Sequence, residues 1–177
     1  PHEVSVAMTG VRLGDRLLQL GCANPTLLGA IASKVGISGH AAVLVTDAAA
    51  AARAARGAAR AGVLVEVEQA SSLHAPYEDG SFDLVVVDNT GNQLGPSSGT
   101  ECTAWLREMQ RLLVPRGRLV AIDAAGRGAF SALFKSAAAR TESAAGDATA
   151  TALRSAGFRS VRTLAERDGL VFTEGVK

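Results

Sequence analysis

The feature of this sequence that most limits its fold is the alternation of short, solidly apolar segments with segments of helical character. Residues 41–46 (AAVLVT) and 83–88 (DLVVVD) are apolar at nearly every position, which is typical of strands buried on both faces of a parallel sheet. Residues 26–35 have apolar side chains at helical spacing, and residues 48–61 are rich in alanine, which favours a helix. This alternation predicts an α/β fold with a doubly wound, mostly parallel, Rossmann-like sheet.

Local signals set the ends of several segments. Asn24 is a good N-cap, and Pro25 suits the first position of a helix. The Asp-Gly pair at 168–169 predicts a hairpin near the end of the chain, which adds an antiparallel strand. The seven predicted strands are residues 16–20, 41–46, 63–67, 83–88, 118–123, 158–165 and 169–173.

The bulk composition predicts one domain over residues 1–177 and excludes several classes of protein. The 18 basic and 17 acidic residues nearly balance, so no general attraction to nucleic acid or to an anionic membrane is expected. No run of 18 apolar residues is present, so no membrane span is predicted. Cys22 and Cys102 lie far apart and the histidines are scattered, so neither a disulfide nor a metal site is predicted, and a cytoplasmic location is expected.

Candidate ligand-binding residues follow the first, second and fourth predicted strands. In an open parallel sheet, ligands bind beyond the carboxyl ends of the strands, where the strand order reverses. Gly21 begins the first of these loops, where backbone can approach a ligand. Asp47 can accept hydrogen bonds from a ribose diol, or cap the following helix, or do both. Asp88 is either a site residue or a strand-end carboxylate that caps the next turn.

Three longer segments resemble the class I S-adenosylmethionine (SAM)-dependent methyltransferases of the small-molecule type. The segment YEDGSFDLVVVDN resembles the part of that family that leads into and through the fourth strand. LREMQRLLVPRGRLVAID resembles the following helix, turn and fifth strand, and ALRSAGFRSVRTLAERDGLVF resembles the last helix and closing hairpin. With the first loop, the resemblance covers about residues 11–175. It implies a seven-stranded sheet with an antiparallel last strand, and SAM as the cofactor bound across the first four strands.

Carried over by position, the resemblance implies which residues lie at the methionine end of the cofactor. Gly21 and Ala23 would face the methionine and the ribose. Asp88 and Asn89 would lie near the methionine end and the transferred methyl group. All four residues lie at or just beyond the carboxyl end of a predicted strand, which is where the sheet topology already places a ligand.

The nucleoside end is assigned in the same way, and here two carboxylates that are usual in the family are missing. Asp47 would hold the ribose hydroxyls, and Ser71 and Ser72 would lie at the adenine. Gln19 stands where the family has the acid of the first loop, and Ser71 stands where an acid usually follows the third strand. A charge-assisted hydrogen bond contributes roughly 1.5–3 kcal/mol, so these losses predict SAM binding weaker by on the order of a hundredfold.

The first loop also departs from the family pattern acid-x-Gly-x-Gly-x-Gly, because Ala23 and Pro25 replace two glycines. Ala23 needs only a negative φ to be tolerated, and Asn24 can supply left-handed geometry where glycine otherwise would. Pro25 removes a backbone donor at the start of a helix, which would harm the binding of a pyrophosphate more than that of SAM. An NAD-dependent oxidoreductase is therefore disfavoured, as it is by the closing hairpin.

The resemblance implies an enzyme that transfers a methyl group from SAM to an unidentified small-molecule acceptor. No residue stands out as a general base, so no catalytic residue is assigned. The alternative is a catalytically silent member of the fold that acts as a binding or partner subunit. The altered loop and the short stretch of about 15 residues before the first strand favour that alternative. The oligomeric state, including a homo-oligomer, is left open.

Overall fold

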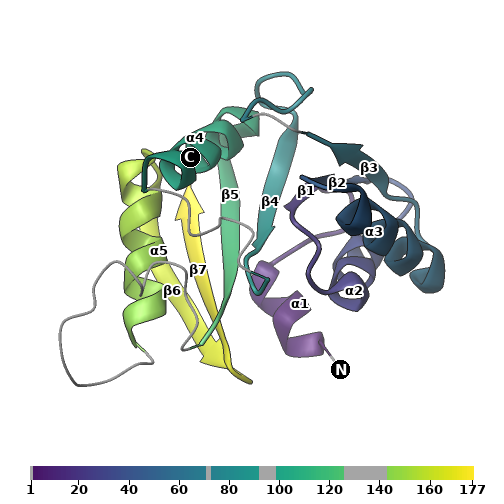
Figure 1. The fold of residues 1–177 in the computed structure, drawn as a ribbon, viewed down its shortest axis with the longest axis horizontal. Helices are drawn as coiled ribbons and strands as arrows, with labels where there is room; N and C mark the ends of the chain where they lie inside the picture. Colours follow the sequence, from purple (N-terminus) through teal and green to yellow (C-terminus); the bar gives the residue numbers. More distant parts are fainter. Residues whose placement is uncertain (1, 71–72, 92–98, 126–142) are drawn as a thin grey trace.

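Helices and strands alternate along most of the chain (Figure 1). The computed structural model describes residues 2–70, 73–91, 99–125 and 143–177. The elements, in chain order, are α1 (Glu3–Thr9), β1 (Arg16–Leu20), α2 (Pro25–Val35), β2 (His40–Val45), α3 (Ala48–Ala61), β3 (Glu66–Gln69), β4 (Phe82–Asp88), α4 (Gly99–Leu112), β5 (Leu113–Ala124), α5 (Ser143–Ser155), β6 (Arg159–Arg167) and β7 (Leu170–Val176).

The strands form one seven-stranded sheet in the order β3-β2-β1-β4-β5-β7-β6. β1 pairs in parallel with β2 and β4, β2 with β3, and β4 with β5, whereas β7 runs antiparallel to both β5 and β6. The predicted doubly wound sheet with an antiparallel C-terminal strand is therefore confirmed. The chain leaves β1 first toward one edge and then toward the other, so the carboxyl ends of β1 and β4 lie together at the reversal point, where such sheets bind ligands.

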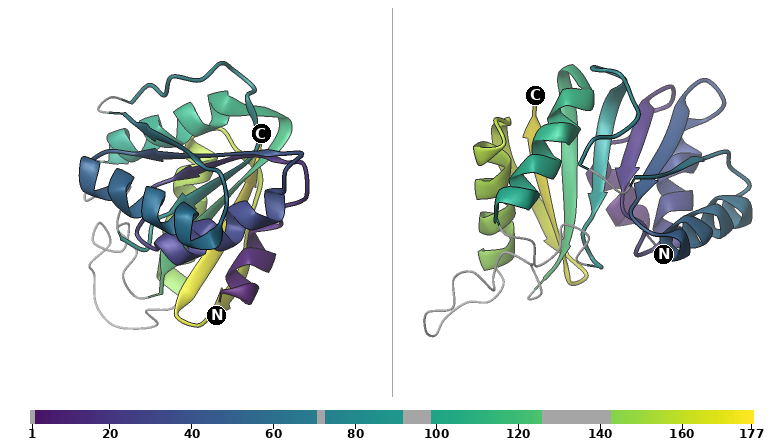
Figure 2. Two further views of the ribbon diagram at one scale, coloured as in Figure 1. Left: turned by 90° about the vertical axis from the view of Figure 1, so that its right-hand side faces the viewer. Right: turned by 45° about the horizontal axis from the view of Figure 1, so that its top comes forward.

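Helices cover both faces of this sheet (Figure 2). In β1, Leu18 and Leu20 pack in the cluster that includes α4 and α5, whereas Leu17 packs in the cluster that includes α1 and α2. In β2, Val43 and Val45 pack against α2 and α3. Neighbouring side chains of a strand point to opposite faces, and here both faces are covered. This explains why the strands are apolar throughout instead of alternating with polar residues.

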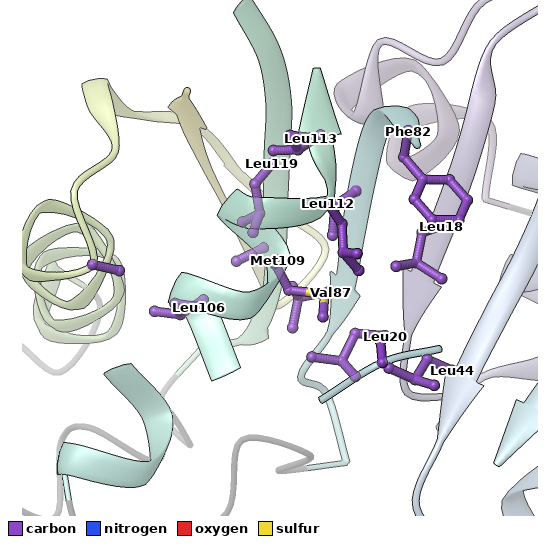
Figure 3. Close-up of a cluster of buried hydrophobic side chains, with 14 of the residues drawn as sticks. Leu18, Leu20, Leu44, Phe82, Val87, Leu106, Met109, Leu112, Leu113 and Leu119 are labelled. Atoms are coloured by element: carbon purple, nitrogen blue, oxygen red, sulfur yellow. The ribbon is translucent and has the colours of Figure 1, made fainter. Parts of the chain in front are cut away.

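The largest apolar cluster fixes α4 on the sheet (Figure 3). Leu18 of β1 and Val87 of β4 belong to it, together with Leu106 and Met109 of α4, and all four side chains are 0% exposed. Burying a side chain of this size contributes about 1.5–3 kcal/mol. α4 is thus held firmly enough to position other side chains that it carries.

The structure differs from the sequence expectation at several boundaries. The sequence does not predict α1, which is short and whose N-cap residue His2 makes no side-chain capping bond. β3 begins at Glu66, later than predicted, because Gly62 and Val63 still close the end of α3 by donating to carbonyls of that helix. β5 begins at Leu113, five residues before the predicted start of that strand at residue 118.

Candidate functional site

The loop between β1 and α2 begins with a turn that requires glycine. Gly21 has a φ of 81°, in the left-handed region that glycine adopts at no steric cost. Its N–H donates to the carbonyl of Leu44 in β2 at 2.8 Å, and its own carbonyl accepts a hydrogen bond from Gln19 Nε2 at 2.9 Å. The start of the loop is therefore tied to β2 and to the end of β1.

Asn24 is the N-cap of α2 and does not have the left-handed geometry considered for it. Its φ is −116°, and its side chain accepts hydrogen bonds from the N–H groups of Thr26 and Leu27, both at 3.1 Å. Ala23 keeps a negative φ, as expected. Pro25 occupies the first turn of the helix, as predicted. The left-handed turn needed by the loop is made earlier, at Gly21.

Asp88 holds this loop from the end of β4. Its side chain is 0% exposed, and its Oδ2 accepts hydrogen bonds from the N–H groups of Ala23 and Asn24, both at 3.0 Å. Its Oδ1 accepts a hydrogen bond from Thr90 Oγ1 at 2.6 Å. The prediction of a carboxylate that caps the next turn is therefore confirmed, whereas no sequence signal indicated the contact with the first loop. All of these donors are neutral, so they solvate the carboxylate without cancelling its charge.

These contacts use the backbone donors from residue 23 to residue 27. The N–H groups of Ala23 and Asn24 donate to Asp88, those of the next two non-proline residues donate to Asn24, and Pro25 has none. A helix N-terminus binds phosphate through N–H groups of this kind. The start of α2 is therefore closed to a pyrophosphate, which strengthens the argument against a dinucleotide cofactor.

Asp47 lies just beyond the carboxyl end of β2 and is exposed to solvent. Its Oδ1 accepts a hydrogen bond from the N–H of Ala50 at 2.7 Å, so it caps α3, as predicted. Within the described ranges, its Oδ2 makes no hydrogen bond. Because Gly21 is bonded to Leu44, three residues before Asp47, the first loop and this carboxylate share one edge of the sheet. One oxygen fixes the helix, and the other remains available to a ligand.

Asn89 takes part in a buried polar network that extends to β5 and α5. Its Nδ2 donates to Asp123 Oδ1 at 2.6 Å, and Thr149 Oγ1 donates to Asp123 Oδ2 at 2.8 Å. Asp123 is 1% exposed. Burial raises the pKa of its carboxyl, against the two hydrogen bonds, which lower it. Asp123 is not among the site residues predicted from the sequence, although it ends a predicted strand just as Asp88 does.

α3 supports the first loop from outside the sheet. A Cβ on Gly57 would overlap the carbonyl oxygen of Pro25, so the two backbones are in direct contact. Arg53 of the same helix donates from Nε to the carbonyl of Cys22 at 3.3 Å. The loop is thus held by side chains and backbone from β1, β4 and α3.

Three further positions named in the comparison with the family are Ser71, Ser72 and Gln19. Ser71 and Ser72 lie outside the described residues. Gln19, which stands where the family has an acid, is 0% exposed. Its Nε2 donates to Gly21, but its Oε1 has no hydrogen-bond partner among the residues that the structure describes. An unpaired buried acceptor costs about 1–3 kcal/mol. The glutamine at position 19 therefore lowers the stability of the protein beneath the first loop.

The sheet order defines a doubly wound, Rossmann-like class of protein, in which ligands bind beyond the carboxyl ends of the strands at the reversal point. A family model described as a methyltransferase domain matches residues 13–166. The chain therefore belongs to this methyltransferase family, and the resemblance seen in the sequence is confirmed. No match was found among curated protein sequences.

Solved structures share the fold at low sequence identity. A SAM-dependent methyltransferase from Aquifex aeolicus is 18% identical with a TM-score of 0.76, over 98% of this chain and 88% of that one. PigF with SAH, the demethylated product of SAM, is 18% identical with a TM-score of 0.66, over 98% of this chain and 54% of that one. The [4+2]-cyclase SpnF is 16% identical with a TM-score of 0.68, over 99% of this chain and 78% of that one.

Proposed function

We propose that this protein is a SAM-dependent methyltransferase that acts on a small-molecule acceptor, with the cofactor at the carboxyl ends of β1, β2 and β4. The observation that carries the proposal is the pair of carboxylates at this edge. Asp47 is exposed with one oxygen uncommitted, whereas Asp88 is fully buried against the loop. This arrangement suits a ligand that has a ribose diol and a positive charge.

The residues present fit the two ends of such a ligand. Asp47 Oδ2 would accept hydrogen bonds from the ribose hydroxyls, while Oδ1 keeps α3 in place. The Gly21 turn and Ala23 would form the wall that faces the methionine part. Asp88 keeps a negative charge just below that wall, where it favours a cation over an anion. The closed helix start is no obstacle, because this ligand has no pyrophosphate.

SAM supplies a methyl group on a sulfonium, which is a good leaving group, so the protein mainly has to align the acceptor. Such alignment can contribute roughly 7–11 kcal/mol to catalysis. The chain would achieve it by fixing the first loop through Asp88 and the end of β4 through the Asn89–Asp123 pair. Neither buried carboxylate is placed as a general base, because both have their oxygens engaged in hydrogen bonds.

The charge balance and the helices of the protein bear on which partners it has. The nearly balanced charge argues against nucleic acid. None of the helices in the described ranges is long and apolar enough to cross a membrane. A cytoplasmic location is part of the proposal, and its support is the cysteine usage of the sequence, with Cys22 and Cys102 far apart. A homo-oligomer or a partner subunit remains compatible with the proposal.

A second candidate is a silent or differently reacting member of the fold. Gln19 favours this reading because a neutral side chain there weakens the electrostatic attraction for SAM. SpnF, described as a [4+2]-cyclase, has the same fold. The two candidates differ in whether the site binds SAM and releases a methyl group.

Calorimetric titration with SAM, SAH and NADH tests the proposal. We expect micromolar binding of SAM and SAH and none of NADH. Asp47→Asn should weaken SAH binding by about 10–100-fold, because charge-assisted hydrogen bonds to the ribose are lost. Asp15→Asn is the matched control: Asp15 also accepts one backbone N–H, from Arg12 at 2.8 Å, but it precedes β1 at the opposite edge. Absence of binding at millimolar SAM and SAH would contradict the proposal and support the silent candidate.

A further inference from the structure

Asp88 is a buried carboxylate that is surrounded by hydrogen-bond donors but not by a cation. It is 0% exposed. Its Oδ2 accepts from the N–H groups of Ala23 and Asn24, and its Oδ1 accepts from the hydroxyl of Thr90 at 2.6 Å and from the Thr90 N–H at 3.3 Å. In the part of the chain that the structure describes, no Lys, Arg or His forms an ion pair with it. Buried charges are normally paired, so the ligand-free site carries an unbalanced negative charge.

The charge of Asp88 acts on the first loop. Cys22 lies in that loop and is buried; burial, and after it the charge of Asp88, raise the pKa of its thiol to about 11. Arg53 donates to the Cys22 carbonyl at 3.3 Å and lowers this pKa, but by less than Asp88 raises it. Arg53 is partly exposed, so water weakens its field more than that of the buried carboxylate. Between these two residues, the negative charge therefore prevails at the loop.

Asp88 also lies where it can supply the charge that the end of β1 lacks. β1 and β4 are neighbours in the sheet (Figure 1), and Gln19 pairs with Val86, two residues before Asp88. Alternate residues of a strand point to the same face, so the side chains of Gln19 and Asp88 lie on one face, below the same loop. Gln19 is neutral where the related methyltransferases have an acid. In this protein the negative charge below the loop thus comes from β4.

We propose that Asp88 is the residue by which the site distinguishes SAM from its demethylated product SAH. The inference rests on the proposed function. The two ligands share the adenosine and the amino-acid part, and differ in the methyl group and the positive charge on sulfur. A fixed negative charge in a poorly solvated place stabilises the sulfonium and has little effect on a neutral thioether. When the methyl group is transferred, the bonding electron pair stays on the sulfur, so the product loses this attraction and leaves more easily.

Calorimetric titration with three ligands separates the effect of charge from that of shape. The third ligand is sinefungin, in which a carbon that bears a protonated amine replaces the methylsulfonium of SAM. The wild type should bind SAM and sinefungin about tenfold more tightly than SAH. Asp88→Asn keeps the size of the side chain and an oxygen for the N–H groups of Ala23 and Asn24. It should weaken the binding of both cations by about tenfold and that of SAH by less than about twofold.

Two further variants are the controls. Asp83→Asn is the matched control: it removes one negative charge from the opposite end of β4, where Asp83 pairs with Arg16 at 3.2 Å, and should leave all three affinities unchanged. Asp47→Asn removes a proposed contact with the ribose, which the three ligands share. It should therefore weaken the binding of all three to the same extent, with their ratios intact.

The wild type alone can overturn the inference, because SAH that bound more tightly than SAM and sinefungin would show that the site does not favour a cation. That comparison does not depend on the folding of any variant. Equal losses of affinity for the three ligands in Asp88→Asn would also overturn it, since the carboxylate would then act only through the shape of the loop. A wild type that binds none of the three would instead overturn the proposed function.

Discussion

Asp88 Oδ2 lies 3.0 Å from the backbone nitrogen of Ala23, so the carboxylate that ends β4 holds the turn that follows β1. The two residues are 65 positions apart in the chain, yet parallel pairing of β1 with β4 places them side by side. The consequence is a first loop whose shape is set by a side chain from a neighbouring strand. A ligand at this edge would meet a preformed wall and two carboxylates instead of free backbone donors.

Removing the Asp88 carboxylate should destabilise the fold more than removing the one at Asp47. Asp88→Ala leaves the part-buried N–H groups of Ala23 and Asn24 without their acceptor and removes a carboxylate from a fully buried position, so we expect a loss of about 2–4 kcal/mol. Asp47→Ala removes only a helix cap, at a cost of about 1 kcal/mol. Urea unfolding of both variants measures the difference, and equal losses would show that the loop contact is unimportant for stability.

Restoring the acid that the family usually has at position 19 should harm this protein. Gln19 pairs with Val86, so its side chain is on the same face of the sheet as that of Asp88, two residues further on. Gln19→Glu would bury a second carboxylate nearby and remove the donor to Gly21, at a cost of about 1–3 kcal/mol. Gln19→Met, which adds no charge, should be less harmful. If Gln19→Glu raised the free energy of unfolding measured in urea, the description of this position as a poor place for a second carboxylate would be wrong.

Gly57→Ala should destabilise the protein although alanine is the better helix former. Propensity alone would favour alanine by about 1 kcal/mol. The new Cβ, however, would overlap the backbone of Pro25, and the resulting strain should outweigh that gain by about 1–3 kcal/mol. Ala52→Gly, at an exposed position of α3, calibrates the propensity effect. If thermal unfolding showed that the Gly57→Ala variant is more stable than the wild type, α3 would not be in close contact with the first loop.

The buried Asp123 carboxyl should make stability fall as the pH rises. Its pKa is raised in the folded protein, so its contribution to stability is fully present below the pKa of the unfolded chain, at about pH 4, and is lost as the pH rises through the folded pKa. Asp123→Asn removes this titration. Relative to the wild type, the variant should therefore gain stability between about pH 4 and pH 7 in urea unfolding. A difference that is constant over this range, or that moves the other way, would contradict the raised pKa.

Much of the fold could be predicted because its signals are local. Residues 48–61 form the predicted helix, since Asp47 caps its start and Gly62 adopts the left-handed geometry that ends it. The Asp-Gly pair at 168–169 has positive φ at both residues, as a tight hairpin turn requires. α1 was missed because it is short and has no capping side chain at its start.

The candidate site could be predicted only in part, since its interactions join distant residues. Asp47 caps a helix that begins at the next residue, so its place follows from sequence. The contact of Asp88 with the first loop depends on which strands become neighbours, and single-sequence patterns do not specify this. The same holds for Asp123, whose partners Asn89 and Thr149 come from two other elements. The sequence allows Asn24 either to cap the helix or to take left-handed geometry in place of a missing glycine, and the structure shows the cap, with the left-handed turn at Gly21.

A crystal structure of the protein with SAH tests the central claim most directly, because it shows where the nucleoside lies. We expect the ribose hydroxyls within hydrogen-bond distance of Asp47 Oδ2, with Asp88 still bonded to the N–H groups of Ala23 and Asn24. A nucleoside bound elsewhere, or Asp88 released from the loop with its place taken by the ligand, would contradict this account of the site.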